Sequence, residues 1–206
     1  LQMIAQALDV QTGTERHRKS LTAARQALRE VDDFANRGSQ LSGDVDVVHV
    51  VSGHRCGALA DDELPSLTPL LATQRYYTFA QEQLAAAVGH VPAASLAMFG
   101  LGKLQTSLPA TGSDDQTAAT AKAMVYYQAA MMVEPRNFLA ANELGVLLGR
   151  VGQWEDARQV LLHGVTLEPN PALWRNLAAV HRRLGEEQLA RLAENEWRMS
   201  AQQQRA

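Results

Sequence analysis

The sequence of 206 residues contains a single cysteine, Cys56, and no long apolar run. One thiol excludes an internal disulfide framework and is compatible with both reducing and oxidising compartments. No stretch reaches the roughly 18 apolar residues that a membrane-spanning helix needs, and no charged segment followed by an apolar core opens the chain. We expect a soluble protein, cytoplasmic or exported. Because the chain begins at Leu1 rather than Met, we also expect a processed fragment whose native leader could have been removed.

The chain has no excess of basic charge. Its 22 acidic and 19 basic residues give a formal net charge of −3 and a pI near 6.1. Proteins that bind nucleic acid usually carry a basic surface, and so do proteins that bind anionic membranes. The charge balance therefore argues against nucleic acid as a partner and gives no reason to expect a membrane surface.

The motifs of common catalytic and cofactor sites are also missing. There is no glycine-rich phosphate loop after a strand, no paired metal-ligand motif and no Ser/His/Asp set that helical placement would bring together. His49, His54 and Cys56 are of zinc-ligand types, but no second paired element accompanies them, so we interpret them as loop and packing residues. We expect no enzyme, no catalytic residue, no metal and no cofactor.

Helical periodicity dominates the residues that are present. Residues 1–64 are interpreted as an N-terminal helical segment with an irregular linker, in which Thr14 is the predicted N-cap of a helix reaching about Arg37. The β-branched residues of 45–51 suit a strand. A lone strand would have nothing to pair with, so a short helix capped by Ser42 or Asp44 is favoured over a strand.

Residues 65–92 offer two interpretations. Thr68-Pro69 has the form of a helix start, with proline at the first helical position. The apolar pattern continues to Val88 without a turn near Arg75. We favour one long helix over a degenerate first repeat.

The most readable unit runs from Asn137 to Pro169 and predicts two amphipathic helices folded against each other. Gly152 ends the first helix, and Pro169 stops the second because it has no backbone donor. The apolar and small positions of the two helices are Ala140, Ala141, Leu144, Gly145, Leu147, Leu148, Val151, Ala157, Val160, Leu161, Gly164 and Val165.

Parts of this unit recur along the chain. Upstream, four positions precede their counterparts Ala157, Leu161, Gly164 and Pro169 by 34 residues: Ala123, Tyr127, Ala130 and Pro135. Downstream, Gly145, Gly152 and Ala157 recur 33 residues later as Ala178, Gly185 and Ala190. Residues 109–120 hold an insertion in the earlier copy, and this segment is interpreted as a solvated loop or a lengthened helix start.

The leucine-glycine pair, aromatic, small residues and closing proline of 144–169, repeated at this period, resemble the tetratricopeptide repeat. The resemblance covers about residues 95–195. It implies an all-α fold, a right-handed superhelical solenoid of antiparallel helix hairpins, with repeats and a C-terminal capping helix in 93–200. The predicted last helix runs from Glu186 to about Ser200. Trp154 and Trp174 are expected to be mostly buried between hairpins.

The resemblance also implies a concave groove formed by the first helix of each hairpin, where such proteins bind extended peptides. The positions that would face it are Phe99, Lys103, Asn142, Val146, Arg150, Arg175, Asn176, Ala179 and Arg183. This set holds four cations, two amides and no carboxylate, although the whole chain is acidic.

The predicted function is therefore a protein–protein interaction module that holds an extended or acidic peptide segment. Asn142 and Asn176 would bond its backbone, and Arg150, Arg175 and Arg183 would pair its charges. In the simplest alternative, these arginines only keep the helices soluble. A structural, self-associating scaffold in a larger assembly is the other alternative, in which one residue of each of the pairs Tyr126-Tyr127 and Met131-Met132 would lie outside the core. The favoured role of these side chains is packing against both neighbouring helices.

Overall fold

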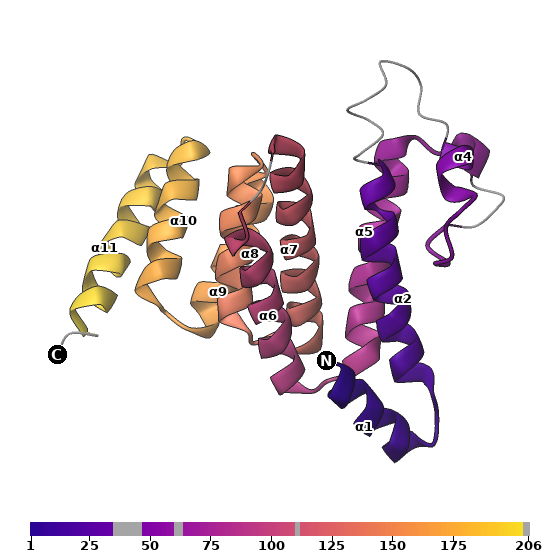
Figure 1. The fold of residues 1–206 in the computed structure, drawn as a ribbon. Coiled ribbons are helices and arrows are strands. Elements are labelled where there is room, and N and C mark those ends of the chain that lie inside the picture. The colour runs from indigo at the N-terminus through magenta and orange to yellow at the C-terminus, as the bar shows by residue number, and fades with distance from the viewer. Residues whose placement is uncertain (35–46, 60–63, 110–111, 204–206) are drawn as a thin grey trace. The chain divides into compact units, whose positions relative to one another are not determined.

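The computed structural model describes residues 1–34, 47–59, 64–109 and 112–203 (Figure 1). Within these ranges the secondary structure is helical and no strand occurs, which confirms the all-α class. None of the described helices is long and apolar enough to cross a membrane. The chain divides into two compact units, residues 1–133 and 134–206.

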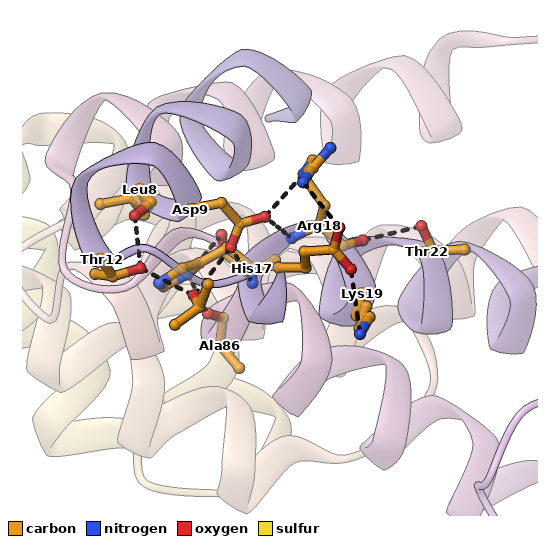
Figure 2. Close-up of polar contacts among 11 residues, drawn as sticks. Leu8, Asp9, Thr12, His17, Arg18, Lys19, Thr22 and Ala86 are labelled. Atoms are coloured by element: carbon orange, nitrogen blue, oxygen red, sulfur yellow. Dashed lines mark hydrogen bonds and ion pairs between the residues drawn. The ribbon is translucent and has the colours of Figure 1, made fainter.

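The first unit begins with α1 (Gln2–Thr12) and α2 (Arg16–Glu30), which are joined by a sharp corner at Gly13. Gly13 has φ +65°, a left-handed conformation that glycine adopts without steric penalty. The carboxylate of Asp9, near the end of α1, organises the corner (Figure 2). It accepts hydrogen bonds from the backbone N–H groups of His17 at 2.8 Å and Arg18 at 3.1 Å, and from Nε of Arg18 at 2.9 Å.

This arrangement corrects the prediction that Thr14 caps the helix. The N-cap residue is Glu15, and its side chain makes no capping bond, because Asp9 already satisfies donors in the first turn of α2. The regular part of α2 ends at Glu30, followed by a turn at Val31 and further helical residues at 32–34. The rest of the predicted span to Arg37 lies outside the described residues.

The short-helix interpretation of the linker is confirmed at α4 (Val47–Val51), whose predicted caps Ser42 and Asp44 lie outside the described residues. After the 3-10 turn η1 (Leu64–Ser66), α5 (Pro69–Val88) is one continuous helix, as the apolar pattern predicts. Thr68 caps it by accepting a hydrogen bond from the N–H of Leu71 at 3.3 Å. Helix α5 packs along α2, and His17 Nδ1 lies 3.1 Å from the carbonyl oxygen of Ala86 near its C-terminus.

A helical hairpin completes the first unit. It consists of α6 (Pro92–Ser107) and α7 (Ser113–Val133), which pack against each other, and α7 also contacts α5. Residues 113–120 lie in α7, so this part of the insertion lengthens the start of the helix. Gly102 of α6 lies directly against the buried ring of Tyr127, where a Cβ would overlap the ring.

The second unit contains two further hairpins. The first is α8 (Phe138–Arg150) with α9 (Trp154–Leu167), and the second is α10 (Pro171–Arg183) with α11 (Glu187–Gln203). Asn137 and Asn170 cap α8 and α10 through their side chains, and Gly152 and Gly185 turn the chain with positive φ. The main apolar side chains of its core are Leu144, Leu147, Leu148, Leu161, Leu173 and Leu177.

The two tryptophans of the hairpins are mostly covered, as expected. Trp154 and Trp174 are both intermediate in exposure, and the indole nitrogen of Trp174 is buried. Trp154, at the first turn of α9, also lines a cavity. The third tryptophan, Trp197 on α11, is 37% exposed.

The Asp9 contacts predict a pH dependence of stability. Burial alone would raise the pKa of the Asp9 carboxyl, but the bonds from the Arg18 side chain and from the N–H groups of His17 and Arg18 outweigh it and lower that pKa. The ionised carboxylate therefore stabilises the fold at neutral pH, and this contribution is lost as pH falls through the folded-state pKa. We expect Asp9→Asn to lower the Tm at pH 7.

The difference in Tm between wild type and Asp9→Asn should shrink as the pH falls below about 4. The control is Glu196→Gln, which removes an exposed carboxyl from α11. A difference for Asp9→Asn that stays constant from pH 7 to pH 3 would contradict the role given to the ionised carboxylate.

Candidate functional site

A cavity of about 460 Å³ lies among α8, α9 and α10 of the second unit. Helices α8 and α10 form its walls, and two residues of α9 complete the lining. Residues of α8 and α9 that line it are Gly145, Val146, Gly149, Arg150, Trp154 and Leu161. Helix α10 contributes Asn176, Ala179, Val180 and Arg183. We call this cavity the α8/α10 cleft.

Two glycines of α8 form part of the floor of the cleft. A Cβ at Gly145 would lie 2.5 Å from Cγ of Leu161, and a Cβ at Gly149 would lie 3.0 Å from Cζ3 of Trp154. The absence of these side chains lets α9 approach the backbone of α8. Around the glycines, Val146, Leu161 and Val180 make the interior of the cleft apolar.

Two arginines stand at the rim, at the C-terminal ends of the two walls. Arg150 is the last residue of α8, Arg183 is the last of α10, and both are exposed. The guanidinium carbon of Arg183 lies 5.6 Å from the centre of the Trp154 ring, a cation–π distance. Within the described residues neither arginine forms an ion pair, although each lies where a helix C-terminus favours positive charge.

Asparagines of both walls meet further toward the N-terminal ends of the helices. Nδ2 of Asn176 donates to Oδ1 of Asn142 at 2.9 Å, and Nδ2 of Asn142 donates to Oε1 of Glu143 at 3.3 Å. An amide side chain has two N–H donors and a carbonyl acceptor. The pair therefore links α8 to α10 and still leaves the Oδ1 of Asn176 to accept a further hydrogen bond.

Charged contacts hold the second wall in place behind the cleft. Glu186, in the turn after α10, forms an ion pair with Arg158 of α9 and contacts Nδ1 of the buried His181 at 2.6 Å. The hydrogen bond with His181 is the main cause that lowers the pKa of the Glu186 carboxyl, with Arg158 acting in the same direction against burial. The carboxylate thus ties the turn between α10 and α11 to α9.

The structure brings most of the predicted groove residues of the second unit together. Val146, Arg150, Asn176, Ala179 and Arg183 line the cleft. Asn142 does not line the cleft, but its side chain accepts a hydrogen bond from Asn176, which does. Arg175 is exposed on α10 and does not line the cleft.

The other two predicted residues belong to the first unit. Phe99 lies on α6 and packs against Tyr127, with ring centroids 6.0 Å apart. Lys103 is exposed on the same helix. Neither lines the α8/α10 cleft, whose lining comes from 145–183.

The sequence pattern does not assign Gly145, Gly149, Trp154, Leu161 and Val180 to the site. It predicts that Gly145 and Leu161 lie in the core of a hairpin, where both are buried, and that Trp154 lies between hairpins. The available signal is the pair Gly145 and Gly149, one helical turn apart, because small residues on one helix face allow a cavity or a close neighbour there.

His54 and Cys56 belong to a separate polar cluster in the first unit. His54 Nδ1 lies 2.6 Å from Oη of Tyr76, and its Nε2 lies 3.1 Å from Oδ2 of Asp33. Glu30 accepts the backbone N–H of Cys56 at 3.2 Å, and burial followed by the bond to Glu30 raises the pKa of the thiol to about 12. No metal-binding group of three is found in the described part of the chain, and the thiol stays protonated at neutral pH.

A second cavity, of about 530 Å³, lies beside this cluster and is lined by α2 and residues 55–57. Its cations are mostly neutralised within the unit. Arg18 pairs with Asp9 at 2.9 Å, and Lys19 pairs with Glu15 at 3.3 Å. The α8/α10 cleft, whose arginines have no such partners in the described residues, is therefore the stronger candidate for a binding site.

Comparison with protein-family models and with curated proteins finds no match to this sequence. The function is therefore inferred from the geometry and charge of the α8/α10 cleft.

The glycine floor predicts opposite effects for two glycine substitutions. Gly145→Ala forces its Cβ against the fully buried Leu161, and such overpacking costs about 1–3 kcal/mol, offset by about 1 kcal/mol of helix propensity. At Gly100, in the middle of α6, an added Cβ would meet nothing within 4 Å. Gly100→Ala should stabilise the protein by about 0.5–1 kcal/mol, whereas Gly145→Ala should destabilise it by up to about 2 kcal/mol.

Urea unfolding of both variants measures these changes in the free energy of unfolding. If Gly145→Ala were as stabilising as Gly100→Ala, the close approach of α8 and α9 would be refuted.

Proposed function

We propose that residues 134–206 bind an extended, acidic peptide segment of another protein in the α8/α10 cleft. The observation that carries this proposal is the pairing of a concave, mostly apolar surface with two rim arginines that have no ion-pair partner in the described residues. A carboxylate between Arg150 and Arg183 would gain charge-assisted hydrogen bonds that these side chains do not make within the chain. The amide pair would hold the peptide backbone, through the free acceptor of Asn176.

The proposal includes the finer fold assignment, that the hairpins α6/α7, α8/α9 and α10/α11 are each tetratricopeptide-like repeats, and that α8/α9 and α10/α11 stack as in a right-handed solenoid. Equivalent contacts support it. Gly102 lies against Tyr127 in one hairpin and Gly145 against Leu161 in another, and Tyr127 and Leu161 are 34 residues apart. The bonded pair Asn142 and Asn176 has the same separation. In such repeats the first helices of successive hairpins form the binding surface.

In this proposal the cleft binds and does not catalyse. Its described lining offers guanidinium, amide and apolar groups, and none of the carboxyl, imidazole or thiol groups that acid–base or nucleophilic catalysis would use. Charged groups beside an apolar surface are typical of sites that recognise another protein.

Self-association is a second candidate, and a specific observation on α11 favours it. Leu189, Leu192 and Met199 are 46%, 60% and 55% exposed, and their spacing places them on one side of the helix. Exposed apolar side chains gathered on one face are typical of an interaction surface. A scaffold would use this outer face, whereas a peptide would use the α8/α10 cleft.

Reversing the charge of the rim arginines distinguishes peptide binding in the cleft from self-association and from arginines that only keep the helices soluble. Random dodecapeptides displayed on phage are selected on the wild-type chain, and the enriched peptides are measured by fluorescence anisotropy. We expect them to be acidic, and we expect Arg150→Glu/Arg183→Glu to weaken binding by about tenfold or more. Binding to the wild type should also weaken as salt rises.

The matched control is Arg191→Glu/Arg198→Glu, which makes the same change in net charge with two exposed arginines of α11. Both variants are first compared with wild type by circular dichroism, since Arg183 also contacts Trp154. Equal weakening by the two variants would mean that only net charge matters and would overturn the proposal. Loss of binding together with loss of a dimer in light scattering, seen only for the α11 variant, would favour the scaffold.

A further inference from the structure

We infer that the α8/α10 cleft selects a bulky apolar side chain that lies within about three residues of a carboxylate in the bound peptide. This inference rests on the proposed function and adds to it the chemistry of a second recognition element. An acidic segment alone would satisfy the rim arginines. The apolar interior of the cleft would instead be filled best by an apolar side chain.

Two features make the interior apolar: small residues leave the space open, and apolar side chains line it. Gly149 and Ala179 put almost no side chain into the space between α8 and α10. The partly exposed Trp154 and Val146 line the remaining space, together with Val180, which is only 5% exposed. The volume of about 460 Å³ falls in the range typical of small-ligand pockets and leaves room for one large side chain.

The spacing of polar groups along α10 determines how far apart the apolar side chain and the carboxylate lie in the bound peptide. Asn176 and Arg183 are seven residues apart on one helix, which corresponds to about 10 Å along its axis. An extended peptide covers that distance in about three residues. A backbone held at the amide pair therefore brings a side chain over the cleft interior and a carboxylate to the arginines within those three residues.

A peptide that matches only the rim arginines, or only the apolar interior, would bind less tightly than one that matches both. A purely acidic peptide would leave water against Trp154 and Val146, whereas a purely apolar one would cover the guanidinium of Arg183 without pairing it. Burying a charged group without a partner is costly, and covering apolar surface is favourable. The joint occupant is a peptide of mixed chemistry, with a leucine, methionine or aromatic residue next to aspartate or glutamate.

The test uses peptides enriched from the random dodecapeptide library. In each, the shared apolar residue is replaced by serine, and affinity is measured on wild type, on Ala179→Trp and on Gln159→Trp. Ala179 is exposed in the wall of the cleft, so its replacement by tryptophan fills the space without entering the core. Gln159 is exposed on α9 and does not line the cleft, so it supplies the matched control.

On wild type and Gln159→Trp, loss of the apolar residue should weaken binding about ten- to a hundredfold, the value of burying one large side chain. On Ala179→Trp the same change should matter less than about threefold, because the space is already occupied. Thermal unfolding of both tryptophan variants first checks that they fold.

Two other outcomes overturn the inference and are distinguishable. Enriched peptides that are acidic but share no apolar residue, or that bind Ala179→Trp as tightly as wild type, would remove the apolar element and leave the proposed function intact. If no enriched peptide depended on Arg150 and Arg183, the proposed function and this inference would both be wrong.

Discussion

The close approach of α8 and α9 at Gly145 is the constraint on which the second unit depends. A Cβ there would lie 2.5 Å from Cγ of Leu161, and the next contact along, at Gly164, would place a Cβ 2.6 Å from Cδ2 of Leu173 on α10. Three helices therefore pack through two positions that have no side chain. Because interiors are packed as densely as crystals, these contacts leave little freedom in how α8, α9 and α10 lie. The shape of the cleft is a consequence of that packing.

Some charged side chains of the second unit already have partners in the chain, and others do not. Arg158 and His181 are bonded to Glu186, and Arg182 is paired with Glu194, so these side chains already have partners within the unit. Arg150 and Arg183 stand at the cleft instead. Exposed ion pairs contribute little to stability, so cations without such a partner cost the fold little and remain able to meet an incoming carboxylate. In an acidic chain, that local reversal of sign is what favours one class of partner over others.

The sequence predicted helices better than it predicted contacts between them. The continuous helix from Pro69 to Val88 and the hairpin of 137–169 followed from apolar periodicity and proline positions, which act locally. The cap of α2 could not be predicted this way, because Asp9 reaches it across a corner from another helix. The bond between Asn142 and Asn176 and the exposure of Trp154 toward the cleft depend likewise on how hairpins stack, which no local pattern encodes.

The most direct test of cleft binding is nuclear magnetic resonance of the isotope-labelled chain titrated with an enriched acidic peptide. The indole N–H of Trp154 and the side-chain amide of Asn176 report on the cleft, and the indole N–H of Trp197 reports on α11. We predict that the first two signals shift on titration, that Trp197 does not, and that a peptide with its acidic residues changed to lysine shifts none of them. Shifts confined to Trp197 and its neighbours on α11 would contradict the account.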